Sequence, residues 1–158
     1  MQLLLVYAAP VTQASDSKAR AWALLLTAHA ALVDEIEAAL AAADLPPLAW
    51  YDVLWELEKA ADGKLRMHEL ARRVVLSRSN LSRLADRLEN AGLVERRDSA
   101  DDGRGWNLVL TRAGRTMRRK MWPVYEAEIE RVFGRHVSAD EARTIGDALA
   151  RAVRAARQ

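Results

Sequence analysis

A chain of 158 residues is long enough to fold around one sizeable core, and its net charge of +2 is small. The absence of cysteine excludes disulfides, a thiolate nucleophile, a cysteine-ligated zinc ion and a thiol redox sensor. The charge is unevenly distributed, because residues 64–120 contain 15 Lys/Arg and 7 Asp/Glu, whereas residues 1–63 contain 3 and 9. Basic charge is therefore concentrated in the middle of the chain, as neutralisation of nucleic-acid phosphates requires.

The first 15 residues, MQLLLVYAAPVTQAS, contain an apolar run that resembles a signal peptide only loosely. No positive residue precedes the run, and its length of about seven residues is at the lower limit for such a segment. No stretch of the sequence approaches membrane-spanning length. We therefore expect a cytoplasmic protein with an N-terminal arm.

Two helices are expected before residue 64. Residues 17–43 are rich in Ala and Leu and predict a long helix, which Asp44-Leu45-Pro46-Pro47 ends. One broad stripe along this helix comprises Trp22, Leu25, Leu26, His29, Leu32, Val33, Ile36 and Leu40. Residues 48–61 predict a second helix, which Asp62-Gly63 stops.

The pattern of residues 67–90 predicts two helices joined by a tight break. Met67, Leu70, Ala71 and Val74 recur at helical spacing, and Ser77 is a good N-cap for the next helix. The second helix carries an apolar stripe of Leu81, Leu84, Ala85 and Leu88. Its start and its opposite side carry small and basic residues, which are Ser77, Arg78, Ser79, Ser82, Arg83 and Arg87.

These small and basic side chains suit a helix whose N-terminal half enters a DNA major groove. Arginine can hold a guanine edge with two hydrogen bonds, and serine permits close approach. The alternative is a solvated helix face with ordinary charges. The segment that follows this helix favours the DNA-reading interpretation.

A basic hairpin is expected after Gly92, which marks the helix end. Residues 93–97 and 106–110 read as two strands, and the polar loop between them is too long for a two-residue turn, so it should project. Arg104 lies near the end of this loop, where it could enter a minor groove. The loop has three Asp and glycines but lacks the closing Glu and ligand spacing of a calcium loop.

Two further helices are expected at the C-terminal end. Thr111 caps a helix from about 112 to 134, in which Pro123 should produce a kink, and Gly134 ends it. Ser138 and Glu141 form a capping box for a last helix that runs to about 157. The terminal helices have little core of their own to bury against, so association with a second copy is the natural solution.

The central motifs resemble those of the MarR family of bacterial transcription regulators. The matching segments are LSRLADRLE at 81–89, GLVER at 92–96, the Asp102-Gly103-Arg104 wing and LTRAGR at 110–115. The family pattern would place an Asp at the position of Ser99. Either Asp98 takes that role after a one-residue insertion, or the wing is braced differently.

The resemblance implies a mainly α fold with a small β-wing. A winged helix-turn-helix at 48–111 would read DNA, and the regions 1–47 and 112–158 would form the dimer by interleaving the two chain ends. Such a dimer presents two recognition helices to a pseudo-palindrome with half-sites about one DNA turn apart. In the resembled family, a crevice between the dimer and DNA-reading regions binds small aromatic, often anionic, effectors.

The residues expected to line such a crevice are Trp22, His29, Trp50, Tyr51 and Trp55. Indole walls suit an aromatic ring, and a histidine can meet a carboxylate. The alternative is that these side chains are ordinary core residues. The three histidines lack metal-ligand spacing, so no metal or cofactor is expected.

The sequence therefore predicts a homodimeric DNA-binding transcription regulator, with repression relieved by a small aromatic carboxylate. The alternative is a winged helix that contacts DNA or protein without any effector. An enzyme is not expected, since the sequence has no nucleophile–base arrangement and no cofactor motif.

Overall fold

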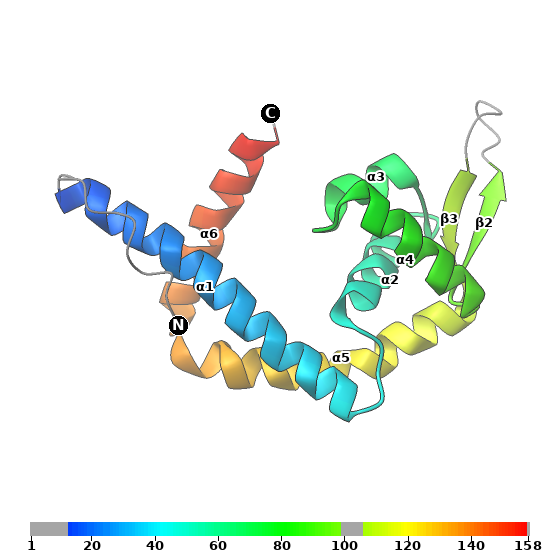
Figure 1. Cartoon of the computed structure of the whole chain (residues 1–158), viewed down its shortest axis with the longest axis horizontal. Coiled ribbons are helices and arrows are strands. Elements are labelled where there is room, and N and C mark those ends of the chain that lie inside the picture. The colour runs from blue at the N-terminus through cyan, green and yellow to red at the C-terminus, as the bar shows by residue number, and fades with distance from the viewer. Residues whose placement is uncertain (1–12, 99–105, 158) are drawn as a thin grey trace. The chain divides into compact units, whose positions relative to one another are not determined.

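The computed structural model describes residues 13–98 and 106–157. The chain divides into two units, one ending at Asp34 and the other beginning at Glu35. The elements in order are α1 (Gln13–Ala42), α2 (Leu48–Lys59), β1 (Lys64–Arg66), α3 (Met67–Arg73), α4 (Arg78–Asn90), β2 (Val94–Asp98), β3 (Trp106–Leu110), α5 (Arg112–Val132), the 3-10 turn η1 (Gly134–His136) and α6 (Ala139–Ala156). The mainly α architecture with a small sheet is confirmed (Figure 1). Within these ranges, no helix is long and apolar enough to cross a membrane.

Helix α1 spans the boundary between the two units. In the first unit several of its large apolar side chains are exposed, among them Trp22, Leu24 and Leu26. In the second unit its last turns bury Ile36 and Leu40. Leu40 is followed closely by Asp44, which adopts a positive φ of 53° where the helix gives way to the Pro46-Pro47 segment. The predicted stripe is therefore buried only at its C-terminal end.

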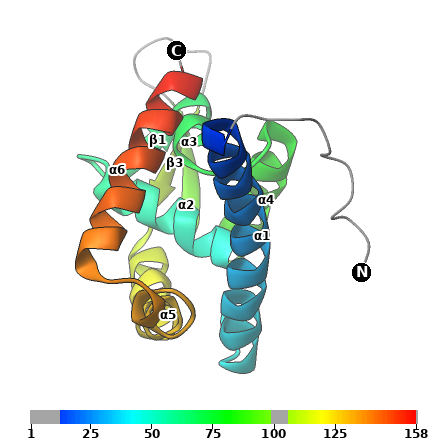
Figure 2. The same cartoon turned by 90° about the vertical axis from the view of Figure 1, so that its left-hand side faces the viewer.

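The main core of the second unit lies among α2, α3, α4 and the sheet, which are gathered together in Figures 1 and 2. Leucine and valine dominate it because all three helices turn one aliphatic stripe inward. Its least exposed large side chains are Val53, Leu54, Leu57, Leu70, Leu81, Leu88, Val94 and Leu108. Leu70, Leu81 and Leu88 come from the helix-turn-helix stripes predicted from the sequence, and the other residues come from α2 and the sheet.

The sheet has three antiparallel strands in the order β1-β3-β2. Strands β2 and β3 form the expected hairpin, with Val94 opposite Leu110. Strand β1 was not expected from the sequence, and it places Leu65 opposite the buried Leu108. Three residues are too few to show the alternation that identifies a strand, so β1 depends on its pairing with β3.

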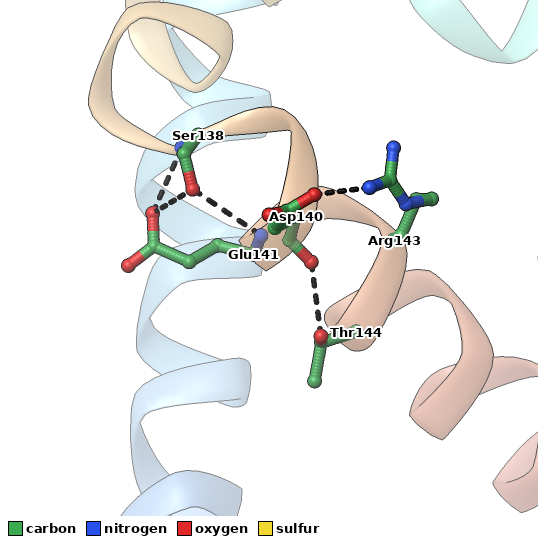
Figure 3. Close-up of polar contacts among 5 residues, drawn as sticks. All are labelled: Ser138, Asp140, Glu141, Arg143 and Thr144. Atoms are coloured by element: carbon green, nitrogen blue, oxygen red, sulfur yellow. Dashed lines mark hydrogen bonds and ion pairs between the residues drawn. The ribbon is translucent and has the colours of Figure 1, made fainter.

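The predicted helix caps are confirmed. Ser77 accepts a hydrogen bond from the backbone N–H of Asn80 at 3.3 Å, and Thr111 accepts one from that of Gly114 at 3.0 Å. At the start of α6, Glu141 accepts from the Ser138 backbone at 2.8 Å, and Ser138 accepts from the Glu141 backbone (Figure 3). These bonds satisfy amides that a helix start leaves without partners.

The end of α5 differs slightly from the expectation. The helix was expected to reach Gly134 but ends at Val132. Phe133 leaves the helical region with φ −130° and ψ −56°, and Gly134 then starts the 3-10 turn η1. Glycine thus follows the helix end, as helix-stop preferences indicate, but the stop comes two residues earlier.

Thr111 and Gly114 join the start of α5 to the end of α4. The Thr111 hydroxyl lies 2.8 Å from the carbonyl oxygen of Gly92 and 2.9 Å from that of Leu93. A Cβ on Gly114 would lie 2.1 Å from the Leu93 oxygen and 2.7 Å from Leu110 Cδ1. Only a residue without a side chain fits at this crossing.

Gly114→Ala is therefore expected to lower the free energy of unfolding by about 1–3 kcal/mol, as overpacking typically does. The measurement is urea denaturation at one protein concentration. Gly146→Ala is the control, because a Cβ there meets nothing within 4 Å in the described chain. That change should leave stability equal or raise it by about 0.5–1 kcal/mol, as removal of a helical glycine does. Equal losses in both variants would contradict the close approach.

Candidate nucleic-acid interface

Helix α4 has two faces of opposite chemistry. Its inner face buries Leu81, Leu84, Ala85 and Leu88 in the main core. Apart from Arg104, the predicted DNA-contacting residues lie within α4 or at its cap and are exposed, namely Ser77, Arg78, Ser79, Ser82, Arg83 and Arg87. The burial pattern therefore leaves a row of small and cationic side chains free to meet a partner.

The N-terminal end of α4 is suited to meet an anion. The first turn contains no acidic residue, and the helix dipole places partial positive charge there. Ser77 is occupied as the N-cap and also lies 3.3 Å from the Ser79 hydroxyl. Arg78 and Ser82 border a groove of about 300 Å³ between α3, α4 and β3, whose other lining is mostly apolar. Arg78 and Ser82 therefore lie together at the edge of this groove.

The wing is placed only in part. Strand β2 ends at Asp98 and β3 begins at Trp106. Arg104, predicted to reach a minor groove, lies outside the described residues, as do Asp101 and Asp102. The described strands bring the two ends of the hairpin loop together, since Asp98 pairs with Trp106.

An arginine that sequence analysis did not single out joins the wing to α4. Arg96 on β2 pairs through its guanidinium with Asp86 and with Glu89, the latter at 2.5 Å. The guanidinium carbon also lies 4.4 Å from the centre of the Trp106 ring, within the range of a cation–π contact. The sequence does show that Asp86 and Glu89 are three residues apart and so lie on one side of a helix. It does not show that both pair with Arg96, because that contact depends on the tertiary fold.

A second cluster lies where α2 packs against α5. Tyr51 stacks on Trp55 and on Trp122, with ring centres 6.5 and 5.9 Å apart, and meets the edge of Tyr125 at 5.1 Å. Arg118 lies over the Trp55 ring at 5.1 Å and forms an ion pair with Glu58 at 2.5 Å. We name Tyr51, Trp55, Trp122 and Tyr125 the aromatic cluster.

Titration of groups near this cluster is shifted by burial. Burial raises the pKa of the Tyr51 hydroxyl, against the opposing effect of the nearby Arg118, and it also raises the pKa of Tyr125. Burial, with the charges of Glu56 and Glu37, raises the pKa of Asp52 to about 6. Both phenols therefore stay neutral at neutral pH, while Asp52 titrates close to it.

The predicted effector residues are divided between the two units. Trp22 and His29 are in the first unit and are exposed. Trp50 packs against the main core rather than within the aromatic cluster, whereas Tyr51 and Trp55 belong to the cluster. Trp122 and Tyr125, which complete it, were not selected from the sequence, because they lie about 70 residues away along the chain. In the described ranges, no three His, Cys, Asp or Glu side chains are grouped to hold a metal ion.

Comparisons with known proteins agree with this architecture. The model of the MarR family matches residues 43–105. The transcriptional repressor MprA of Escherichia coli K12 is 37% identical over 67 residues, which are 42% of this chain and 38% of that protein. The chain thus spans well under half the length of this curated relative.

Two solved structures share the fold along nearly the whole chain. AbsC, a MarR family transcriptional regulator from Streptomyces coelicolor, has a TM-score of 0.81 at 28% identity and covers 95% of this chain and 99% of its own. Sco3205, a MarR family regulator from the same organism solved in complex with DNA, has a TM-score of 0.80 at 26% identity and covers 94% of each chain. The resemblance is confirmed, because residues 43–105 match the MarR family model and the fold is similar to that of MarR family transcriptional regulators.

Proposed function

We propose that this protein is a transcription regulator that binds double-stranded DNA through α4. The observation that carries the proposal is the exposed row of Arg78, Ser79, Ser82 and Arg83 on a helix whose opposite face is fully buried. An α-helix with this division enters a major groove while its buried face stays anchored. Sco3205, which has the same fold and was solved in complex with DNA, supports DNA binding by this chain.

Charge supports binding to the DNA backbone as well as to bases. The region from 64 to 120 contains 15 Lys/Arg and 7 Asp/Glu, and two of those acids, Asp86 and Glu89, are already paired with Arg96. Affinity should therefore fall steeply as salt rises, because phosphate neutralisation releases counterions. Arg104 remains our candidate for a minor-groove contact.

We also propose that the regulator is a homodimer formed by its terminal helices. On α6, Ile145, Leu149 and Val153 form one stripe at four-residue spacing, and each side chain is at least 38% exposed. Exposed apolar side chains in a continuous row mark an interaction surface. Trp22, Leu24 and Leu26 on α1 supply further exposed apolar surface. A two-fold dimer would present two copies of α4 to a pseudo-palindrome.

Finally, we propose that the protein is a repressor whose release from DNA is triggered by an aromatic carboxylate. Its site would include the aromatic cluster, where indole and phenol rings already stack and Arg118 offers a cation. Trp22, His29 and Trp50 remain predicted contacts. The relative MprA, described as a transcriptional repressor, favours repression over activation.

The DNA proposal is tested with Arg83→Ala. The probes are a duplex selected by the wild-type protein from a random-sequence pool and an unselected random duplex, measured by fluorescence anisotropy at fixed salt. Affinity for the selected duplex should fall by about 1–3 kcal/mol, the usual worth of a good base contact, and affinity for the random duplex much less. Arg143→Ala on α6 is the control, because Arg143 is exposed and paired with Asp140. Equal losses on both duplexes would limit Arg83 to phosphate contact.

The dimer proposal is tested with Leu149→Asp. A charge inside the apolar stripe should raise the dimer dissociation constant about tenfold or more in sedimentation velocity, as loss of a central interface contact does. Binding to the selected duplex should weaken in parallel. Arg151→Ala, two residues further along the same helix and off the apolar stripe, should change neither. A monomeric wild-type protein, or an unaffected dimer in the Leu149 variant, would overturn this interface.

The effector proposal is tested with a panel of benzoates, indole carboxylates and hydroxyphenyl carboxylates. Binding should quench tryptophan fluorescence and lower affinity for the selected duplex several-fold, corresponding to a coupling of about 1–3 kcal/mol. Trp55→Leu and His29→Ala should lose this response while still binding DNA without ligand. His136→Ala, an exposed histidine in η1, should retain it. A panel that changes neither fluorescence nor DNA affinity would leave the aromatic cluster as packing alone.

A further inference from the structure

We propose that Arg96 is a positioning residue for sequence recognition, which fixes the orientation of α4 relative to the wing. This inference rests on the proposed DNA-binding function and adds a residue that acts through α4 rather than on bases. Its basis is that one side chain joins three elements, since Arg96 lies on β2, its acidic partners lie on α4, and Trp106 begins β3.

Glu89 holds Arg96 at two points. Its Oε1 accepts a hydrogen bond from the Arg96 backbone N–H at 3.1 Å, and its Oε2 accepts one from Nη1 at 2.5 Å. The second guanidinium nitrogen, Nη2, donates to Asp86, one turn earlier on the same helix. Because the guanidinium is planar and rigid, simultaneous pairing with Asp86 and Glu89 constrains the rotation of α4 as well as its distance from β2.

Trp106 closes the arrangement from the side of β3. The guanidinium lies over its ring at 4.4 Å, and the Arg96 side chain is only 28% exposed. Partial removal from water strengthens both the cation–π contact and the ion pairs. Arg96 is therefore held on two sides, by carboxylates and by the indole ring.

The aliphatic core alone does not supply this constraint. Leu81, Leu84 and Leu88 oppose separation of α4 from the core, but hydrophobic contact is non-directional and tolerates small rotations of the helix. Arg83 lies about one turn before Asp86 on α4, and Arg87 is the residue after it. A rotation about the helix axis would move these arginines relative to base edges.

Arg96 also offsets charge on the exposed side of α4. The Asp86 side chain is 56% exposed and lies one turn after Ser82 and Arg83. Without a cation beside it, this carboxylate would face DNA phosphates as a like charge. Loss of Arg96 would thus remove both an orienting contact and a charge compensation. Lysine at position 96 would keep the positive charge beside Asp86 but would lose the planar pairing with both Asp86 and Glu89.

The experiment compares Arg96→Lys and Arg96→Met with wild type, using the ratio of affinities for the selected and random duplexes at fixed salt. Arg96→Lys should keep random-duplex affinity and reduce the ratio about tenfold, the size of one lost base contact. Arg96→Met should reduce the ratio at least as much and weaken both affinities. All measurements are made where circular dichroism shows each variant fully folded.

Neighbouring substitutions provide the controls. Arg97→Met removes the next arginine of β2, which pairs with Glu95 and is 65% exposed, so it should leave the ratio unchanged. Glu89→Gln should reduce the ratio in the same direction as Arg96→Lys, and the double variant should lose less than the sum of the two single losses, because the two residues share a contact.

The outcomes separate this inference from the proposed function. An unchanged ratio in Arg96→Lys, or the same drop in Arg97→Met, would overturn the positioning role while leaving DNA binding intact. A parallel loss of both affinities in Arg96→Lys would reduce Arg96 to a stability residue and also overturn it. Wild-type protein that binds neither duplex would overturn the proposed function, and this inference with it.

Discussion

The burial of one face of α4 is the interaction on which the rest of the described winged helix-turn-helix region depends. Leu81, Leu84 and Leu88 enter a core shared with α2, α3 and the sheet, and each buried leucine contributes about 1.5–3 kcal/mol relative to exposure. Because helix periodicity links the two faces, burying these leucines obliges Arg78, Ser82 and Arg83 to point outward. The same contacts that fold the domain therefore present its candidate reading surface.

The terminal helices, unlike α4, leave most of their apolar side chains exposed. Helix α6 has no buried residue in the described chain, although its capping box is complete and its apolar stripe is continuous. An isolated helix of 18 residues gains little stability from its own hydrogen bonds. The first unit is similarly exposed, from Trp22 to Leu26. These exposed apolar surfaces are the physical basis of the dimer proposal.

Local signals explain what the sequence predicted well. N-caps, glycine stops and leucine spacing each depend on a few adjacent residues, so the two helices of the helix-turn-helix and the β2–β3 hairpin were anticipated. Strand β1 was missed because only its pairing with β3 defines it. The role of Arg96, and the meeting of Tyr51 with Trp122 and Tyr125, were missed for a related reason. Each of these contacts joins side chains that are far apart in the sequence, and no local sequence pattern links them. Of the expected effector residues, only Tyr51 and Trp55 lie in the aromatic cluster.

Two contacts between secondary-structure elements use the same combination of side chains. Between α2 and α5, Arg118 lies 5.1 Å from the Trp55 ring and pairs with Glu58, just as Arg96 lies over Trp106 and pairs with Glu89. In each case a carboxylate and an indole hold one guanidinium between two elements, which adds direction to an otherwise aliphatic contact. An aromatic carboxylate offers both of these partners in one molecule. Such a ligand between α2 and α5 would stack beside Trp55 and compete with Glu58 for Arg118, and so act on the contact that joins the winged helix-turn-helix region to α5. The proposed effector and the proposed role of Arg96 therefore rest on one principle, namely that arginine pairing sets the orientation of elements whose proximity is fixed by leucine.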